Sequence, residues 1–269
     1  MSWTLYKTMM KKNRGGIIGY SVGTSLFLLM IVQIYPMVLE NEEAMNQMLK
    51  AYPEALLSAF GMNENTLSAL EGFLSVQYFS LMFLIIVAIF TILMTTKLIA
   101  RLVDTGSMAY LLSVPTSRVK IITTMIFVFL TGLACILVSN FLVGYFGAFT
   151  LEKGDLDINR YFQLNAGGFL LFYAIGGYSI LFSAICNDEK RALALSGGIT
   201  LFFYMANFLG NLNESFDVLK SFSLFTLFDS ASIASGEKDI WMPALIFFLI
   251  GTACYGLAIY LFKRRNLPL

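Results

Sequence analysis

The chain has 269 residues, of which 58% are hydrophobic and 13% are charged, and its mean hydropathy is +0.74. A soluble domain usually carries about 25% charged residues, so this composition excludes an ordinary water-soluble fold. Histidine is absent, which removes His-dependent catalytic triads and zinc sites. Cys135, Cys186 and Cys254 are far apart and give neither a disulfide framework nor the spacing of metal ligands.

The N-terminal segment combines aromatic and basic side chains. Trp3, Tyr6 and Met10 fall near one face of a helix, and Lys7 and Lys11 fall elsewhere. A helix of this kind lies at the headgroup boundary, where its ammonium groups meet lipid phosphates. The sequence therefore predicts an N-terminal interfacial helix, and the alternative is a charged leader that only obeys the positive-inside rule.

Six apolar blocks follow, and each is long enough to cross about 30 Å of hydrocarbon, for which a helix needs about 20 residues. We therefore predict an all-α integral membrane protein of six transmembrane helices in a single domain, residues 1–269. The predicted spans are 16–35, 76–96, 121–149, 164–185, 192–210 and 241–262.

The charged residues divide between the two sides that six spans create. Thirteen of the 18 Lys and Arg residues fall in the N-terminal segment, in the connections after the second and fourth spans, and at the C-terminus, whereas 14 of the 17 acids fall on the other side. Basic residues of short loops concentrate in the cytoplasm. We therefore predict that both termini are cytoplasmic.

Two segments on the outer side are more than simple loops. The acidic outer segment 36–75 has apolar residues at helical spacing between Ala55 and Phe60, and Gly61 suits a helix cap. The stretch 218–228 is apolar but too short to span, which favours a re-entrant or interfacial helix.

The coupling segment 97–120 connects the second and third spans on the cytoplasmic side. It is amphipathic, Gly106 interrupts it, and Pro115 suits the first turn of the next helix. Such a segment is typical of a docking site for a peripheral partner. The alternative is a solvated loop with incidental leucines.

Several stretches resemble a known family. Residues 104–107 read Asp-Thr-Gly-Ser, and residues 111–118 read Leu-Leu-Ser-Val-Pro-Thr-Ser-Arg. This run resembles the cytoplasmic signature of type-2 ABC transporter permeases, in which an acid, any residue and Gly-Thr precede Leu-Leu and then Pro-x-Ser-Arg. Residues 52–61, 222–236 and 262–268 are similar to further motifs of that family, in the family's order.

The resemblance implies an exporter-like permease that pairs with a second permease chain, identical or paralogous, and binds two copies of a cytoplasmic ATPase. The chain lacks a Gly-x-x-x-x-Gly-Lys phosphate loop, so ATP and magnesium would bind to the partner and no cofactor to this chain. The implied ATPase contacts are Asp104, Gly106, Ser107, Leu111, Leu112, Pro115 and Arg118. The sequence departs from the family pattern at Ser107, at Asn266, and at Arg101 and Leu102, where many members carry a further acid.

Two further sets of residues are candidates for function. The connection after the fourth span offers a second ATPase contact, with a solvated, self-neutralising loop as the alternative: Asp188, Glu189, Lys190 and Arg191. Asn140 and Asn207 are candidates for lining a transport path, although such residues more often bond across helices.

The expected function is that of the membrane subunit of an ATP-driven exporter in a bacterial cell membrane. The cargo is hydrophobic or amphipathic: an antimicrobial peptide, an antibiotic or a lipid-like molecule. The spans contain no charged residue, which argues against a proton- or sodium-driven carrier. An ATP-independent transporter or channel, and a non-transporting anchor of a sensor complex, are the alternatives, and no nucleic-acid partner is expected.

Overall fold

The computed structural model describes residues 1–41, 51–52, 57, 69–113, 115–151, 156–212 and 216–265. Within these ranges the regular structure is entirely helical, and six helical stretches are long and apolar enough to cross a membrane. This confirms the predicted fold class and the number of spans. The six are α1 (Trp3–Glu40), α5 with α6 (Met82–Asp104), α8 (Arg118–Phe149), α9 (Ile158–Ile185), α10 (Glu189–Leu212) and α13 (Trp241–Arg264).

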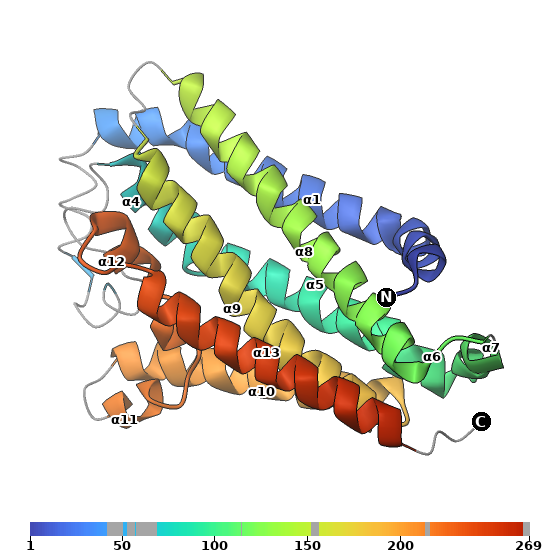
Figure 1. Ribbon diagram of the computed structural model, residues 1–269. Helices are drawn as coiled ribbons and strands as arrows, with labels where there is room; N and C mark the ends of the chain where they lie inside the picture. The colour runs from blue at the N-terminus through green and yellow to red at the C-terminus, as the bar shows by residue number, and fades with distance from the viewer. Residues whose placement is uncertain are drawn as a thin grey trace.

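The long helices lie side by side and run between two ends of the molecule (Figure 1). The start of α1 and the end of α13 lie at one end, together with α6 (Ala100–Asp104) and α7 (Ser107–Ser113). The opposite end carries α4 (Leu70–Leu74), α11 (Asp217–Lys220) and α12 (Ser230–Ser235). The first and last spans thus have their terminal ends at the same end of the molecule as the coupling segment, and the predicted cytoplasmic placement of that end stays a prediction.

The N-terminal segment is continuous with the first span, and its expected place at the headgroup boundary stays a prediction. Helix α1 runs without interruption from Trp3 to Glu40, and Gly15 and Gly16 lie within it. The helix nevertheless changes direction. Tyr6 donates a hydrogen bond to Thr131 of α8, while Ile17 contacts the adjacent Gly132. In a straight helix, Tyr6 and Ile17 would lie about 16 Å apart along the axis and could not both reach neighbouring residues of α8. Figure 1 shows the bend: the first turns of α1, in the darkest blue, point in a different direction from the rest of the helix.

Beyond Ile17, α1 and α8 pack in parallel. The Ser25 hydroxyl donates to Asn140 Oδ1 at 3.2 Å, and Gln33 Nε2 donates to Thr150 Oγ1 at 2.9 Å. The two bonds are thus eight residues apart on α1 and ten residues apart on α8, as expected for two neighbouring helices that cross at a shallow angle. Cross-helix hydrogen bonds of this type stabilise membrane bundles modestly.

The second span begins differently from the prediction of one helix over 76–96. The chain forms α4, then a π-helical turn at Ser75–Phe79, and α5 (Met82–Leu98) starts only after a break at Leu81. At the start of the π turn, the Ser75 carbonyl accepts hydrogen bonds from the hydroxyls of Ser80 and Ser230 at 2.8 and 3.1 Å. Side-chain donors of this kind satisfy a broken ladder inside a membrane protein.

Most of the outer segment 36–75, including the predicted helix near Ala55 and Phe60 and the cap at Gly61, lies outside the described residues. The predicted helix over 218–228 was wrong. The structure has the short α11 and a single 3-10 turn, Phe225–Leu227. Ser223 separates them, because its hydroxyl donates to the Phe203 carbonyl at 2.6 Å and accepts from the Phe225 N–H at 3.1 Å.

Helix α9 lies at the centre of the bundle and packs most closely against α13. An added Cβ at Gly177 of α9 would lie 2.9 Å from the Gly251 carbonyl oxygen and 3.0 Å from its Cα. The two backbones touch here because both residues lack a side chain, a common arrangement in membrane helix pairs. By contrast, α10 and α13 expose most of their apolar surface, with 22% and 28% of their spanning windows buried. That surface suits lipid or another membrane chain.

Candidate functional site

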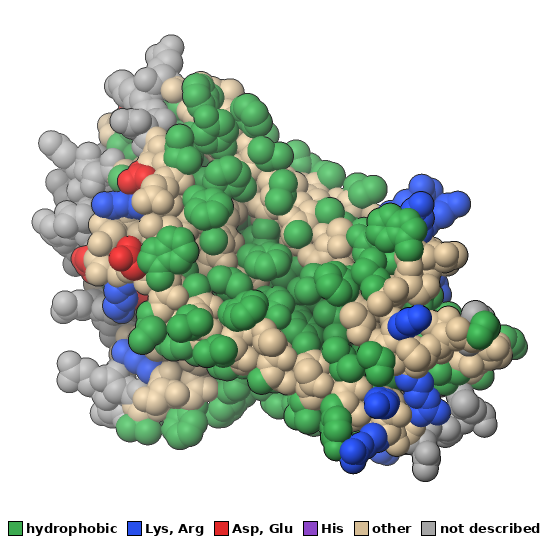
Figure 2. Space-filling model, viewed as in Figure 1, with side chains coloured by type: hydrophobic (Ala, Val, Ile, Leu, Met, Phe, Trp, Pro, Cys, Tyr) green, Lys and Arg blue, Asp and Glu red, His purple; other side chains and the backbone are tan. Residues whose placement is uncertain are grey.

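The end of the molecule that carries α6, α7 and the start of α1 is rich in basic side chains. In Figure 2, most of the Lys and Arg side chains in view lie at this end, the middle of the molecule is largely apolar, and the acidic side chains in view lie at the other end beside a smaller number of Lys and Arg. We call the first the basic end. It contains every implied ATPase contact that the structure describes, so the candidate site is the surface formed here by α6, α7 and the turn before α10.

Gly106 separates α6 from α7, as predicted. Its φ of +68° is a left-handed conformation that only glycine adopts readily. The hydroxyls of Thr105 and Ser107 lie 2.9 Å apart across it, and α7 begins at Ser107. The turn therefore fixes the direction of α7, and any side chain at position 106 would strain the backbone.

Helix α7 divides its apolar side chains between this chain and the surroundings. Met108 is buried, and Leu111 and Leu112 are half-buried against the core. Tyr110 is 80% exposed. Part of each leucine is thus engaged by its own chain, and Tyr110 offers the larger free apolar surface. Tyr110 is not among the implied ATPase contacts, because it lies between the two parts of the motif, residues 104–107 and 111–118.

The segment after α7 differs from the prediction in one respect. Pro115 does not stand in the first turn of the next helix. Helix α8 begins at Arg118, and Ser117 is its N-cap, whose hydroxyl accepts from the Lys120 N–H at 3.3 Å. Serine is a preferred N-cap residue, and it prevails over the preference of proline for a first turn. Pro115 is exposed at the surface of the basic end.

Arg118 is held inside a network rather than standing free. Its guanidinium donates to the backbone carbonyl of Arg265, just after α13. Arg265 in turn donates to the carbonyl of Ala184 at 2.6 Å and to the side chain of Asn187. Desolvation lowers the pKa of the Arg265 guanidinium, and the nearby Cys186 thiol opposes this shift. The network joins the ends of α8, α9 and α13, and sequence spacing gave no sign of it.

The turn before α10 is the second predicted contact, and the structure brings it against the first. Arg101 Nε of α6 lies 3.7 Å from Glu189 Oε2. Asp104 accepts from the Glu189 N–H at 3.4 Å. Within the turn, Asp188 accepts from the Arg191 N–H at 2.7 Å and pairs with the Arg191 guanidinium at 3.1 Å. Asp188 and Arg191 neutralise each other, as the alternative interpretation expected, while α6 and the turn form one continuous surface.

The two asparagines proposed as path-lining residues occupy different settings. Asn140 is fully buried. Its side chain accepts from Ser25, and its carbonyl accepts from the Tyr161 hydroxyl at 2.9 Å. Asn140 thus connects α1, α8 and α9. Asn207 of α10 is half-buried and accepts from Thr226 at 2.9 Å. Both make bonds between elements, which is what such residues most often do.

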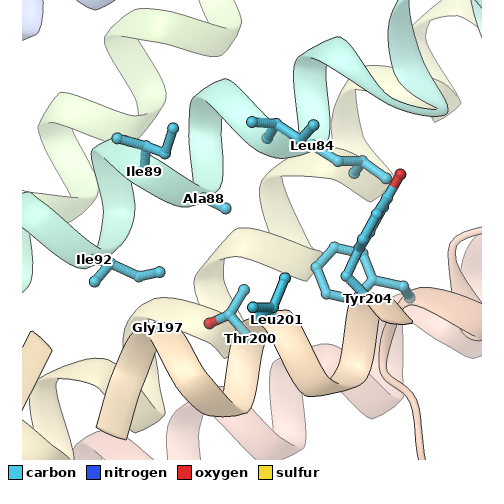
Figure 3. Close-up of a pocket in the computed structure, with 10 residues that line it drawn as sticks. Leu84, Ala88, Ile89, Ile92, Gly197, Thr200, Leu201 and Tyr204 are labelled. Atoms are coloured by element: carbon cyan, nitrogen blue, oxygen red, sulfur yellow. The ribbon is translucent and has the colours of Figure 1, made fainter. Parts of the chain in front are cut away.

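A groove lies on the membrane-facing side between α5 and α10 (Figure 3). It has a volume of about 160 Å³, and Leu84, Ile89 and Leu201 contribute to its apolar wall. Thr200 and Tyr204 are the labelled residues that carry hydroxyls, and the Thr200 hydroxyl is hydrogen-bonded to that of Tyr178 at 2.6 Å. The groove therefore suits an apolar group. Among the described residues, no cluster of acids and cysteines could hold a metal ion.

The chain matches the family model described as multidrug efflux system permease Rv1217c, C-terminal domain, over residues 8–263. The match covers nearly the whole chain and all six candidate spans, so the chain belongs to this family. No curated protein and no solved structure matches it. The protein is accordingly a multi-pass membrane permease of an efflux system, and its role is transport rather than catalysis.

Proposed function

We propose that the chain is the transmembrane subunit of an ATP-driven ABC exporter in the bacterial cell membrane, and that a separate cytoplasmic ATPase docks on its basic end. The observation that carries the proposal is the joint surface of α6, α7 and the 186–191 turn. Two stretches that are 85 residues apart in sequence meet there through Arg101, Asp104 and Glu189. A shared surface is what a peripheral motor needs in order to transmit a movement to α5, α8, α9 and α10 together.

The chemistry of this surface fits a protein partner. Tyr110 projects from α7 with 80% of its surface free, and a tyrosine that fills a partner's pocket is a frequent source of binding energy. Gly106, Ser107 and Pro115 shape the surface around it, while Asp104 is exposed at its edge. Exposed charges at the edge set register and association rate more than affinity.

The second permease chain would pack on the exposed face of α10 and α5. Of the six candidate spans, α10 has the smallest buried share, at 22%, and its exposed side chains include Leu201, Phe202 and Met205. The groove of Figure 3 lies beside them. A partner chain that inserts side chains into this groove would complete the α5–α10 face, as the resemblance implies for a paired transporter.

The transported molecules would be hydrophobic or amphipathic, such as antibiotics, amphipathic peptides or lipid-like compounds. The family is named for multidrug efflux. The predicted spans contain no charged residue, so they offer no proton or ion relay of the kind that ion-driven carriers place within the membrane. An apolar path suits cargo that partitions into lipid.

Transport into inside-out vesicles tests this function. The chain is produced together with the proteins encoded beside it, and accumulation of a fluorescent lipophilic drug is followed on addition of ATP. We expect accumulation with ATP and none with a non-hydrolysable analogue. A matched preparation with the phosphate-loop lysine of the ATPase changed to alanine should be inactive. Accumulation driven by a proton gradient without ATP would overturn the proposal.

A further inference from the structure

Two adjoining cavities lie at the basic end; Ser107, the first residue of α7, lines one of them, whereas the exposed Tyr110 lines neither. The first has a volume of about 380 Å³, and the bend of α1, the end of α5 and the start of α6 surround it. The second, of about 250 Å³, continues from it between α1 and α5. Asn13, Lys97 and Arg101 line both, so the two form one recess that leads from the aqueous boundary into the apolar part of the bundle.

The mouth of this recess is strongly basic. Lys12, Lys97 and Arg101 line the first cavity, and no acidic side chain does. In the described part of the chain, no ion pair involves Lys12 or Lys97, and Arg101 has only the 3.7 Å contact with Glu189, which lines the second cavity. Three cations against one acid leave a net positive recess that suits an anionic group.

The inner wall of the recess is apolar. Ile17 and Tyr20 of α1 face Phe90, Leu93 and Met94 of α5 there. Lys97 lies one helical turn beyond Met94. The recess therefore places a positive mouth only a few residues from an apolar wall. This combination matches a molecule that has an anionic head and a hydrocarbon tail. A free inorganic anion would make no use of the apolar wall.

Asn13 provides a further polar group between these two parts. Its side chain is almost completely buried, with 4% exposed, and Nδ2 donates to the Met9 carbonyl at 2.9 Å. Its Oδ1 atom is buried without a hydrogen-bond partner. A buried acceptor without a donor costs free energy, so a ligand with a hydroxyl group at this position would satisfy it.

We infer that the recess between α1, α5 and α6 binds an anionic phospholipid of the leaflet at the basic end. The phosphodiester would lie among Lys12, Lys97 and Arg101, a headgroup hydroxyl such as that of phosphatidylglycerol would donate to Asn13, and an acyl chain would follow the wall formed by Ile17 and Phe90. Basic pockets between membrane helices are known to hold such headgroups. The inference requires that the chain spans a membrane, and it does not depend on ATP-driven transport.

The positive-inside rule alone places lysines near this boundary, so the test compares lysines inside and outside the recess. Lys12 and Lys97 line it, whereas Lys11 and Lys120 are exposed at the same end and do not. The variant Lys12→Gln/Lys97→Gln and the control Lys11→Gln/Lys120→Gln remove the same charge. A general attraction of the basic end for anionic lipid would weaken equally in both.

The full chain, purified in neutral detergent without an ATPase, is titrated with phosphatidylglycerol, with phosphatidylcholine and with soluble glycerol 3-phosphate, and binding is counted by native mass spectrometry. Each cation near a lipid surface contributes about a fivefold factor in affinity, so the Lys12/Lys97 variant should bind phosphatidylglycerol roughly 25-fold more weakly. The control variant should bind it as the unmodified chain does, and phosphatidylcholine should bind weakly to all three. Equal losses in the two variants would overturn the inference, and so would glycerol 3-phosphate binding as tightly as the lipid.

A second pair of variants tests the apolar wall with the charges intact. Gly16 lines the second cavity, and a side chain there would meet no atom of the protein within 4 Å. Gly15 is equally free of neighbours but points about 100° away around the helix. Gly16→Phe should therefore reduce phosphatidylglycerol binding, and Gly15→Phe should not. Equal binding by both variants would show that the lipid does not enter the recess.

Discussion

Arg101 and Glu189 form an ion pair with 3.7 Å between Nε and Oε2, and this pair connects α6 to the first residue of α10. The two residues belong to the two stretches that the sequence singled out separately as partner contacts. Both side chains are partly exposed, at 54% and 28%, so the pair adds little to stability. Its importance lies in position, because it holds α6 and the 186–191 turn as one surface.

The modest strength of this pair can be measured with a double-mutant cycle. Arg101→Gln, Glu189→Gln and the double variant should show a coupling free energy of about 0.2–1 kcal/mol, because solvent screens an exposed pair. Chemical unfolding in detergent micelles provides the measurement. A coupling of several kcal/mol would mean that the pair is shielded from water, contrary to the structure.

The orientation of the basic end can be tested with the cysteine that follows α9. Cys186 is half-buried at the basic end, whereas Cys135 and Cys254 lie within α8 and α13. In a variant with Cys135→Ser and Cys254→Ser, a membrane-impermeant maleimide should label Cys186 in inside-out vesicles and not in intact cells. Labelling only in intact cells would reverse the proposed topology.

The same thiol should show a measurable pH dependence. Burial raises the pKa of Cys186, Asp188 raises it further, and Arg265 and Arg191 oppose the shift. A higher pKa leaves less thiolate at a given pH, so alkylation should require a more alkaline solution than a free cysteine does. Asp188→Asn should move the alkylation profile to lower pH, and Arg191→Gln should move it higher. Asparagine retains the capping of α10, and an unchanged profile would contradict this electrostatic account.

The close contact of α9 and α13 predicts a sharp difference between two glycines. Gly177→Ala would place a methyl group 2.9 Å from the Gly251 carbonyl oxygen, and backbone cannot yield as a side chain can. We expect a loss of about 1–3 kcal/mol of stability, as for other overpacked sites. Gly256→Ala on α13 meets no atom within 4 Å and should cost nothing. Thermal unfolding in detergent compares the two, and equal stability would contradict the packing.

The sequence predicts the six spans well because uninterrupted apolar stretches must form helices in lipid. It does not reveal the break at Leu81 or the π turn before it, because the stretch from Val76 to Thr96 is mostly apolar and the bond to the Ser75 carbonyl comes from Ser230, about 150 residues away. Hydropathy carries no information about such a contact.

The candidate site could also be predicted only in part from the sequence. The position of Gly106 correctly predicted the break between α6 and α7, because a left-handed turn favours glycine. The exposure of Tyr110 depends on how α7 rests on the core. The network of Arg118 and Arg265 depends on three helix ends that meet only in the folded chain. A turn such as the one at Gly106 can be predicted from the local sequence, whereas the burial of a side chain depends on the complete fold.

Site-specific cross-linking from position 110 tests the central claim most directly. Tyr110 is replaced by the photo-reactive benzoyl-phenylalanine, which its exposure should allow, and Trp241, which is exposed at the opposite end of α13 from Arg264, is replaced in a control. Illumination of membranes should join position 110, and not position 241, to a protein that carries an ATP-binding phosphate loop. If position 110 forms no such adduct while the transporter is active, or if position 241 forms it equally, the proposed docking of an ATPase on the basic end is wrong.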